Sequence, residues 1–311
     1  MKPYVIFVVG PTASGKTDLA VKLGKYLSSE VISADSMQIY KGMHIASAAP
    51  DAGETGGVPH SMVEFLPYGA AFTVADYAEA ARREIDRVIS NGLVPVVVGG
   101  TGLYISALAD NIKFLPVKTD LKLRARLERE YDETGGEKML SRLYIIDPAA
   151  AEKLQPGDKR RIVRALEIYE TSGVTKSVQN AVSKQEPPCF TPIMIGLNFK
   201  DRQKLYEKIN RRVDLMMEKG LLDEAKAAFE AGVKAGGAQA IGHKEFFGYF
   251  RGEQTLGEAV ETLKRSTRRY AKRQLTWFNN DSRVNWIYVD ESEDVYADAL
   301  KIIEKEKNEN A

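Results

Sequence analysis

A phosphate-loop motif near the amino terminus constrains the fold more than any other feature of this sequence. It matches G-x-x-x-x-G-K-[S/T], follows an apolar run that predicts a strand at Tyr4–Val9, and precedes a helical pattern at Thr17–Leu27. In such a loop, backbone N–H groups turn toward an anion, the lysine neutralises charge and the last hydroxyl can hold Mg²⁺. The alternative is a chance match in a structural loop. The predicted phosphate-binding residues are Gly10, Pro11, Thr12, Ala13, Ser14, Gly15, Lys16 and Thr17, with Thr17 as the candidate metal ligand.

Strand-like and helix-like segments alternate from the start, which is the pattern of a parallel sheet covered by helices. A loop-rich stretch, Gly42–Gly69, interrupts the alternation, and beyond Pro116 several helical patterns follow one another without a strand. We therefore predict an α/β fold: a P-loop-containing parallel sheet flanked by helices, with an all-helical insertion domain. The predicted domains are the first part of a catalytic core at 1–117, the helical insertion at 118–188, and the core completion with a basic helical region at 189–311. Further strands are predicted at Val31–Ala34, Val94–Val98, Ile193–Asn198 and Val284–Val289, and helices at Thr73–Ser90, Leu121–Glu133, Glu137–Leu143, Ala149–Leu154, Arg160–Thr171 and Val295–Lys307.

Composition narrows the class of protein. The 311 residues carry 44 Lys and Arg against 43 Asp and Glu, a formal net charge of +1, which is typical of a globular chain. The apolar runs are far shorter than the roughly 18 residues of a membrane helix, and no leader-like segment opens the chain, so we expect no membrane and a cytoplasmic location. One cysteine, Cys189, excludes an internal disulfide, and the three histidines match no metal-ligand spacing. A monomer is the default expectation.

Two residues at predicted strand ends are candidates for chemistry. A nucleoside triphosphatase has a second strand that ends in a metal-supporting Asp, but Val94–Val98 ends in Gly-Gly-Thr. Asp35, after Val31–Ala34, is therefore interpreted as a metal supporter, as a general base, or as an Asp that only caps a turn. Thr101 either donates to a phosphate or leaving-group oxygen, or serves as the N-cap of the next helix.

A helical segment near the carboxyl terminus is strongly basic. Between Thr262 and Asn280 there is no acidic residue, while cations recur in pairs every four positions. Such a stripe predicts contact with a phosphate backbone; the alternative is a solvated face balanced by acids on neighbouring helices. A smaller cluster in the helical insertion comprises Lys159, Arg160, Arg161 and Arg164. The stripe itself consists of Lys264, Arg265, Arg268, Arg269, Lys272 and Arg273.

These motifs, in this order, resemble the bacterial tRNA dimethylallyltransferase (tRNA isopentenyltransferase) family over nearly the whole chain. Seven matching segments in sequence order are very specific, although any one alone could mislead. The segments are 10–17, 35–43, 57–60, 99–104, 161–167, 209–214 and 269–278.

The resemblance implies transfer of a dimethylallyl group from dimethylallyl diphosphate to N6 of adenosine 37 of tRNA, with Mg²⁺. It implies that the P-loop holds a diphosphate leaving group and not ATP, with Thr101 and Arg212 assisting, and that Asp35 is the general base. It also implies that the target base flips into a channel lined by Ser36, Met37 and Gln38. Further tRNA contacts implied in this way, by the helical insertion, involve Arg124, Lys159, Arg160, Arg161, Ile162 and Val163.

Three positions depart from the family pattern, and two other activities remain open. Ala48, Ser61 and Asn279 stand where the family usually has Lys, His and Arg, which bears on substrate affinity. A prenyltransferase for free adenosine nucleotides would share Asp35 and Thr101 but would not need the basic stripe. A P-loop kinase would hold ATP and use Asp35 to activate a hydroxyl. A non-catalytic RNA-binding module is disfavoured by the intact P-loop.

Overall fold

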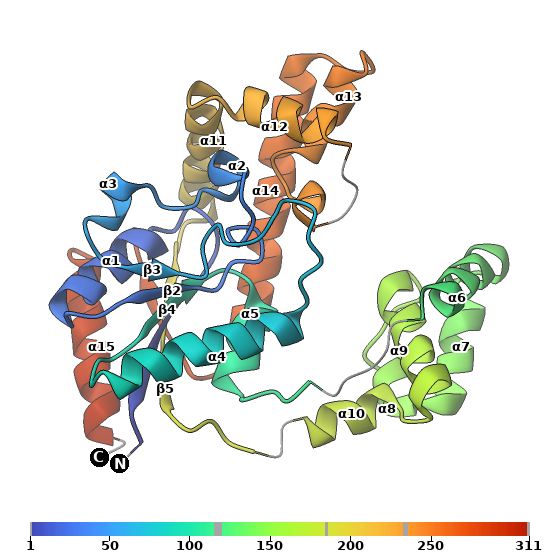
Figure 1. The fold of residues 1–311 in the computed structure, drawn as a ribbon, viewed down its shortest axis with the longest axis horizontal. Coiled ribbons are helices and arrows are strands. Elements are labelled where there is room, and N and C mark those ends of the chain that lie inside the picture. Colours follow the sequence, from blue (N-terminus) through green and yellow to red (C-terminus); the bar gives the residue numbers. More distant parts are fainter. Residues whose placement is uncertain (1, 115–119, 184–185, 233–235, 310–311) are drawn as a thin grey trace. The chain divides into compact units, whose positions relative to one another are not determined.

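The protein was analysed as a computed structural model that describes residues 2–114, 120–183, 186–232 and 236–309 (Figure 1). The chain forms two compact units, one made of residues 1–109 with 188–311 and the other of residues 110–187. The predicted boundary between 117 and 118 lies outside the described residues. The other predicted boundary, between 188 and 189, lies one residue beyond the observed one.

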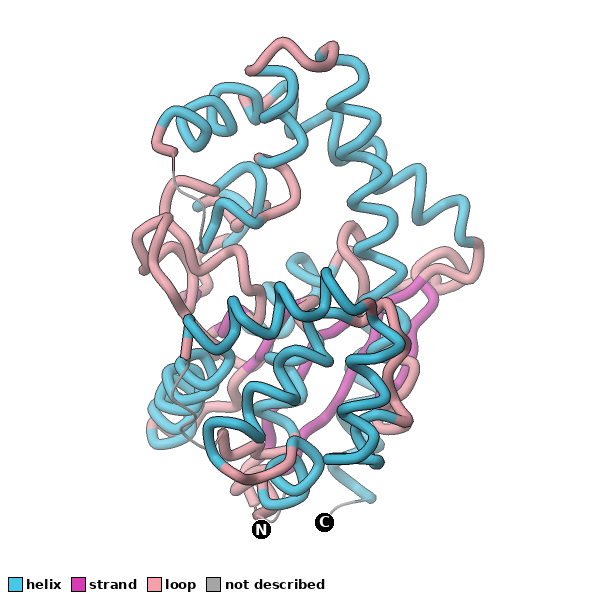
Figure 2. Tube along the Cα trace, turned by 90° about the vertical axis from the view of Figure 1, so that its right-hand side faces the viewer, coloured by secondary structure: helices cyan, strands magenta, loops and turns pink. Residues whose placement is uncertain are grey.

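The larger unit is built on a six-stranded parallel sheet with helices on both sides (Figure 2), as the alternating pattern predicted. The strand order is β3-β2-β4-β1-β5-β6. Because all the strands run in one direction, their carboxyl ends, where such sheets bind ligands, lie at one edge. The strands are β1 (Tyr4–Val9), β2 (Val31–Ser33), β3 (His60–Ser61), β4 (Val96–Gly99), β5 (Thr191–Asn198) and β6 (Val284–Tyr288).

The stretch predicted as loop-rich contains short regular elements. Edge strand β3 pairs in parallel with β2 through His60 and Ser61, and two four-residue helices, α2 (His44–Ser47) and α3 (Ala52–Thr55), precede it. Helices this short have no detectable period in the sequence, which is why the pattern did not predict them.

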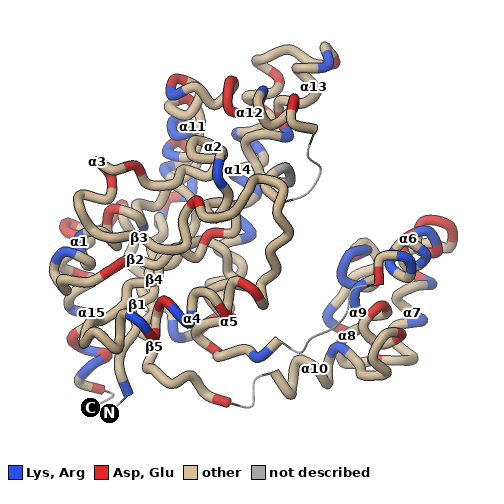
Figure 3. The backbone as a smooth tube through the Cα atoms, viewed as in Figure 1, with Lys and Arg blue, Asp and Glu red and all other residues tan. Residues whose placement is uncertain are grey.

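Helices from the carboxyl-terminal third form a separate group within the larger unit. Long helix α14 contains the predicted basic stripe, and Lys and Arg recur along it (Figure 3). Phe246 and Leu263 are buried in the hydrophobic cluster that holds this group together. The elements are α11 (Arg202–Glu218), α12 (Leu221–Glu230), η1 (Gly236–Gln239), η2 (Lys244–Phe246), α13 (Phe247–Phe250) and α14 (Leu256–Phe278).

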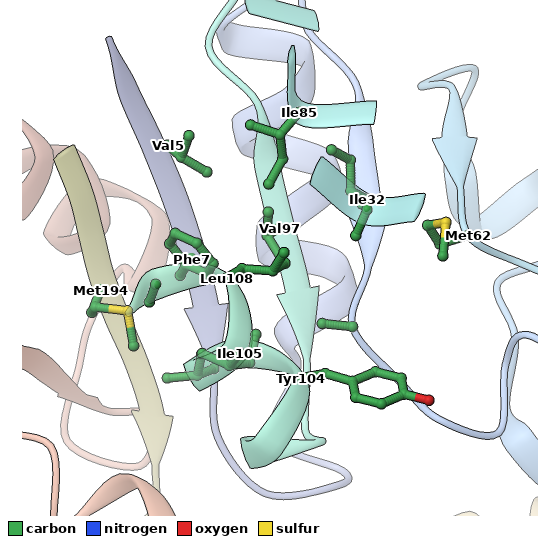
Figure 4. Close-up of a cluster of buried hydrophobic side chains, with 14 of the residues drawn as sticks. Val5, Phe7, Ile32, Met62, Ile85, Val97, Tyr104, Ile105, Leu108 and Met194 are labelled. Atoms are coloured by element: carbon green, nitrogen blue, oxygen red, sulfur yellow. The ribbon is translucent and has the colours of Figure 1, made fainter. Parts of the chain in front are cut away.

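Two hydrophobic clusters cover the two faces of the sheet. Alternate residues of β1 point to opposite faces, so Phe7 packs with helices α4 and α5 whereas Ile6 packs with α1 and α15. Figure 4 shows the first cluster, in which Phe7, Val97 and Ile85 lie near one another. A capping box between Thr73 and Asp76 starts α4, the helix predicted at Thr73–Ser90. The covering helices are α1 (Lys16–Tyr26), α4 (Val74–Ser90), α5 (Gly102–Ala109) and α15 (Val295–Glu309).

The smaller unit is wholly helical in its described part, with its own core around Leu127, Leu143 and Leu166. The buried carboxylate of Glu167 accepts hydrogen bonds from Arg124 and Arg164. None of the helices in the described part of the chain is long and apolar enough to cross a membrane. The helices of this unit are α6 (Leu121–Thr134), α7 (Gly136–Ile146), α8 (Pro148–Ala151), α9 (Lys159–Ser172) and α10 (Lys176–Val182), the last of which the sequence pattern did not predict.

Candidate active site

The P-loop connects β1 to α1 and has the backbone conformation that its glycines allow. Gly10 has φ 139°, and a Cβ there would lie 2.3 Å from the carbonyl oxygen of Leu197. Gly15, with φ 88°, is the N-cap of α1. The Lys16 ammonium donates to the carbonyl of Pro11 at 2.5 Å. The loop therefore holds Lys16 against itself at the carboxyl end of β1.

A cavity of about 300 Å³ lies at this edge of the sheet. It brings together the P-loop, the loop after β2, the glycines after β4, and helices α11 and α14. A second cavity of about 400 Å³ is also lined by the P-loop and shares Lys16, Thr17 and Arg212 with the first. Predicted site residues in the wall of the first cavity are Thr12, Lys16, Thr17, Asp35, Ser36, Met37, Gln38, Arg212 and Arg273.

Charges in this wall are desolvated. Burial, together with the neighbouring Arg212 guanidinium, lowers the pKa of Lys16 to about 7, although the Asp35 carboxylate opposes this shift. Burial raises the pKa of Asp35, against the lowering effect of the Met37 N–H and of Lys16. Burial also lowers the pKa of Arg212. Lys16, Arg212 and the Asp35 carboxyl group thus face one space. This space suits an anionic ligand bound beside a second ligand that carries a basic group.

Asp35 has a structural contact as well as its place in the cavity. Its Oδ1 accepts a hydrogen bond from the backbone N–H of Met37 at 2.8 Å, so the turn-capping interpretation is correct for this oxygen. Gln38 fixes the same loop, because its amide accepts from the Ser33 hydroxyl at 2.7 Å and donates to the Ala48 carbonyl at 3.0 Å. The carboxylate is therefore held by its own loop and still lines the cavity.

Thr101 follows the cavity-lining Gly100 and contacts the Asp35 loop. Its hydroxyl accepts a hydrogen bond from the Ser36 N–H at 3.0 Å. The N–H groups of Tyr104 and Ile105 donate to the backbone carbonyl of Thr101 at the start of α5. The hydroxyl thus contacts the residues of the site, and the backbone begins the helix.

The cations of the basic stripe divide into two groups. Lys264 is paired with Asp214 at 2.7 Å, as the alternative of a balanced face predicted, and Arg268 donates to Asn210 at 2.6 Å. The exposed members are Arg265, Arg269, Lys272 and Arg273. Arg273 also lines the first cavity, so the exposed part of the stripe continues to the site.

The predicted RNA-binding residues of the helical unit divide similarly. Arg160 and Arg161 are exposed, whereas Lys159 pairs with Asp132 at 2.5 Å. Ile162 and Val163 are 0 % and 2 % exposed in the core of the unit. The prediction is corrected for their side chains. They extend from α9 into the hydrophobic core of the unit, so they cannot contact a ligand on the surface.

Donor groups for a metal ion are few at the site. The described residues contain no cluster of three or more His, Cys, Asp or Glu side chains that could hold a metal. Thr17 lines both cavities, and one or two protein oxygens suffice for Mg²⁺ when phosphate oxygens and water complete its shell. The donor set therefore fits Mg²⁺ bound together with a phosphate ligand.

Comparison with known proteins decides the family. The family model described as IPP transferase matches residues 38–281, and the model described as isopentenyl transferase matches residues 1–62. A tRNA dimethylallyltransferase of Acetivibrio thermocellus is 46% identical over 289 residues, which cover 92% of each chain. The chain belongs to the tRNA dimethylallyltransferase family. It is therefore a prenyl-transferring enzyme.

Solved structures of relatives have the same fold. The full-length tRNA isopentenylpyrophosphate transferase of Bacillus halodurans is 38% identical, with a TM-score of 0.72 over 100% of this chain and 99% of that one. A eukaryotic dimethylallyltransferase, described as acting on tRNA, is 27% identical, with a TM-score of 0.82 over 99% of this chain and 80% of that one. The predicted fold class and family are therefore confirmed.

The three departures from the tRNA dimethylallyltransferase pattern lie in different places. Ala48 lines the second cavity and has φ 48° at the end of α2. Ser61 belongs to edge strand β3, and Asn279 is the exposed C-cap of α14. Of the three, Ala48 lines the cavity that also contains Lys16, Thr17 and Arg212, so an effect on substrate affinity is expected chiefly there.

Sequence reasoning missed two buried polar groups of this transferase. His243, whose partners the sequence does not identify, is 0 % exposed and lies between the Tyr68 hydroxyl, at 3.0 Å, and the Glu224 carboxylate, at 2.8 Å. Glu224 also accepts the N–H groups of Ile45 and Ala46 at the start of α2. Gln274, described below, is the second. An isolated histidine or glutamine in a helical stretch gives no pattern by which such partners could be predicted.

Proposed function

We propose that this enzyme transfers the dimethylallyl group of dimethylallyl diphosphate to N6 of adenosine 37 in the anticodon loop of tRNA, forming N6-isopentenyladenosine. The observation that carries the proposal is that the P-loop, the Asp35 loop and Arg273 of the basic helix line one cavity. A phosphate site, a carboxylate and an RNA-facing cation are thus adjacent, as prenyl transfer from a diphosphate to a nucleic-acid base requires.

The diphosphate binds at the P-loop in this proposal. Lys16, Thr17 and Arg212 lie in both cavity walls and offer charge and hydrogen bonds to its oxygens. Thr17, together with the diphosphate, would hold Mg²⁺, and this ion would supply additional positive charge there. The strand after which a triphosphatase has its metal-supporting Asp ends in Gly99 here, which favours a diphosphate ligand over ATP.

The transfer breaks the allylic C–O bond and forms an N6–C bond. Negative charge grows on the diphosphate as the bond breaks, and Lys16 and Arg212 stabilise it where it develops. The N6 amine is a weak nucleophile because its lone pair is delocalised into the ring. Asp35 accepts the N6 proton, and its raised pKa makes it a stronger base than an exposed carboxylate. The products are the prenylated base, free diphosphate and protonated Asp35.

The tRNA contacts both units in this proposal. The target base leaves its stack to reach the cavity, where Ser36, Met37 and Gln38 contact it. The exposed cations Arg265, Arg269, Lys272 and Arg273 bind the phosphate backbone. The helical unit contributes Arg160 and Arg161, while Arg124 and Lys159 already have acidic partners that RNA phosphates would replace or extend. We expect the enzyme to act as a monomer in the cytoplasm.

The test is a competition between acceptors. The enzyme is incubated with dimethylallyl diphosphate and Mg²⁺, with an anticodon stem-loop containing adenosine 37 and with free AMP, and both acceptors are analysed by mass. One added dimethylallyl unit on the stem-loop alone supports the proposal. Modification of AMP alone supports the nucleotide prenyltransferase. In a parallel incubation with ATP, conversion of ATP to ADP without prenyl transfer supports the kinase.

A further inference from the structure

A buried glutamine of α14 joins two loops of the candidate site. Gln274 is 4 % exposed. Its Oε1 accepts a hydrogen bond from the backbone N–H of Thr12 at 2.8 Å, and its Nε2 donates to the backbone carbonyl of Gly100 at 3.0 Å. Thr12 belongs to the P-loop after β1, and Gly100 to the connection between β4 and α5. One side chain therefore connects loops that are 262 and 174 residues away in the sequence.

The chemistry of this position requires an amide. The Thr12 N–H needs an acceptor and the Gly100 carbonyl needs a donor, and only a side chain such as Asn or Gln presents both on one rigid group. A carboxylate would place an oxygen against the carbonyl, and an ammonium would leave the N–H without an acceptor. A Cβ on Gly100 would lie 1.9 Å from Nε2, so glycine is required opposite the amide.

The link reaches the groups that carry the proposed reaction. Pro11, next to Thr12, accepts the Lys16 ammonium at 2.5 Å. On the other side, Thr101, next to Gly100, accepts the N–H of Ser36 from the loop of Asp35. Gln274 thus stands between the segment that holds the phosphate-binding lysine and the segment that holds the proposed base.

We propose that Gln274 is a positioning residue for prenyl transfer, which fixes the P-loop relative to the β4–α5 connection so that the diphosphate and the acceptor base meet. The proposal depends on the proposed function and adds a residue that acts through Thr12 and Gly100. Because Gln274 is adjacent in sequence to Arg273, the same helix also presents an exposed cation to RNA. Its effect is nevertheless expected on diphosphate binding and on the transfer step, because these two hydrogen bonds join the P-loop to the β4–α5 connection.

Gln274→Met tests the link, because methionine has a similar length but no comparable donor or acceptor. We expect kcat to fall about tenfold or more and KM for dimethylallyl diphosphate to rise about fivefold, since small misplacements of reacting groups are costly. The Kd of the stem-loop should stay within about twofold, because the phosphate-contacting cations are unchanged. Gln274→Glu should be no more active than Gln274→Met, because its carboxylate oxygen repels the Gly100 carbonyl.

The matched control is Asn280→Ala, just beyond the carboxyl end of α14, whose amide donates to the Thr276 carbonyl. It should keep wild-type kinetic constants. If Gln274→Met does not fold, Gly100→Ala is the second variant, because its Cβ would displace the Gln274 amide. It should give the same changes in kcat, KM and stem-loop Kd. Wild-type kcat and KM in folded Gln274→Met, or full activity of Gln274→Glu, would overturn the proposal.

Calorimetric binding of inorganic diphosphate separates this proposal from the proposed function, because it requires neither RNA nor transfer. Gln274→Met should weaken this binding about fivefold through its effect on the P-loop. If wild-type enzyme does not prenylate the stem-loop but Gln274→Met binds diphosphate more weakly than wild type does, the proposed function is wrong. The role of Gln274 in joining the two loops is then still supported. If the variant loses stem-loop affinity and keeps diphosphate affinity, Gln274 acts through RNA and the proposal is wrong.

Discussion

The hydroxyl of Thr101 accepts a hydrogen bond from the backbone N–H of Ser36 at 3.0 Å. The two residues follow the neighbouring strands β4 and β2, and Ser36 is next to Asp35 in the loop. Thr101 therefore helps to fix the position of the loop that carries the proposed base. A side chain predicted to act on the leaving group also has a structural partner on the acceptor side.

Thr101→Val removes this acceptor with little change of shape. We expect kcat to fall about tenfold or more, because the Ser36 N–H loses its partner and the Asp35 loop shifts. Steady-state kinetics with the stem-loop checks this. Thr101→Ser retains the hydroxyl and should recover most of the activity. Equal activity of the valine and serine variants would exclude a role for the hydroxyl.

Asp35→Asn tests the base directly. The amide keeps an oxygen to accept the Met37 N–H but cannot take up the N6 proton, so kcat should fall by about 10²–10⁴-fold. Diphosphate and stem-loop affinities should change little, since the base acts in the transition state. Single-turnover measurements with both substrates saturating are the appropriate check. An unchanged single-turnover rate removes Asp35 from the mechanism.

Lys16 makes diphosphate binding depend on pH. Its pKa of about 7, lowered from the ordinary 10.5, leaves it mostly neutral above that pH, whereas a bound diphosphate favours the charged form. Affinity should therefore weaken as pH rises above about 7, and binding at pH about 8 should take up a proton. Calorimetry in two buffers of different ionisation enthalpy measures the uptake. Lys16→Met should abolish it, and an uptake that persists in this variant contradicts the assignment.

The same shift affects the stability of the free enzyme. Between the folded pKa of about 7 and the unfolded value of 10.5, the unfolded state binds more protons at Lys16. Its contribution to the free energy of unfolding therefore increases with pH across that window. A rise in pH should therefore stabilise the free enzyme through Lys16, whereas the same rise should weaken diphosphate binding.

The salt dependence of RNA binding should distinguish exposed from paired cations of α14. Arg269 is exposed, so Arg269→Ala should lower the slope of log K against log salt by about one unit. Lys264 already neutralises Asp214, so Lys264→Ala should change the slope much less. Titrations of a labelled stem-loop at several salt concentrations give both slopes. Equal slopes for the two variants would mean that the exposed Arg269 contacts RNA phosphates no more than the paired Lys264 does.

Glu167 should be important for the stability of the helical unit. Its carboxylate is fully buried and accepts hydrogen bonds from Arg124 and Arg164, both of which remain partly exposed. Glu167→Gln should reduce the free energy of unfolding by about 1–3 kcal/mol, since hydrogen bonds between charged groups are lost. Urea unfolding followed by circular dichroism measures this. Glu170→Gln, on the more exposed side of α9, is the comparison and should cost less.

Several features could be predicted from sequence because they depend on neighbours along the chain. The P-loop between β1 and α1, the capping box of Thr73 and the parallel α/β order follow from local periodicity and from glycine and cap chemistry. Short elements such as β3 could not, because two residues carry no period. The burial of Ile162 and Val163 was also missed, because motif resemblance does not say which side of a helix packs inward.

The sequence by itself determined where the P-loop lies and which of its residues are candidates for phosphate binding, because the P-loop motif encodes its own backbone geometry. The tertiary structure alone decided which groups meet. Gln274 contacts Thr12 across 262 residues, and Lys264 meets Asp214 on another helix, which no local pattern specifies. The reason is physical: the packing of α14 against the sheet and α11 sets these partners, and hydrogen bonds between distant segments form only once that packing exists.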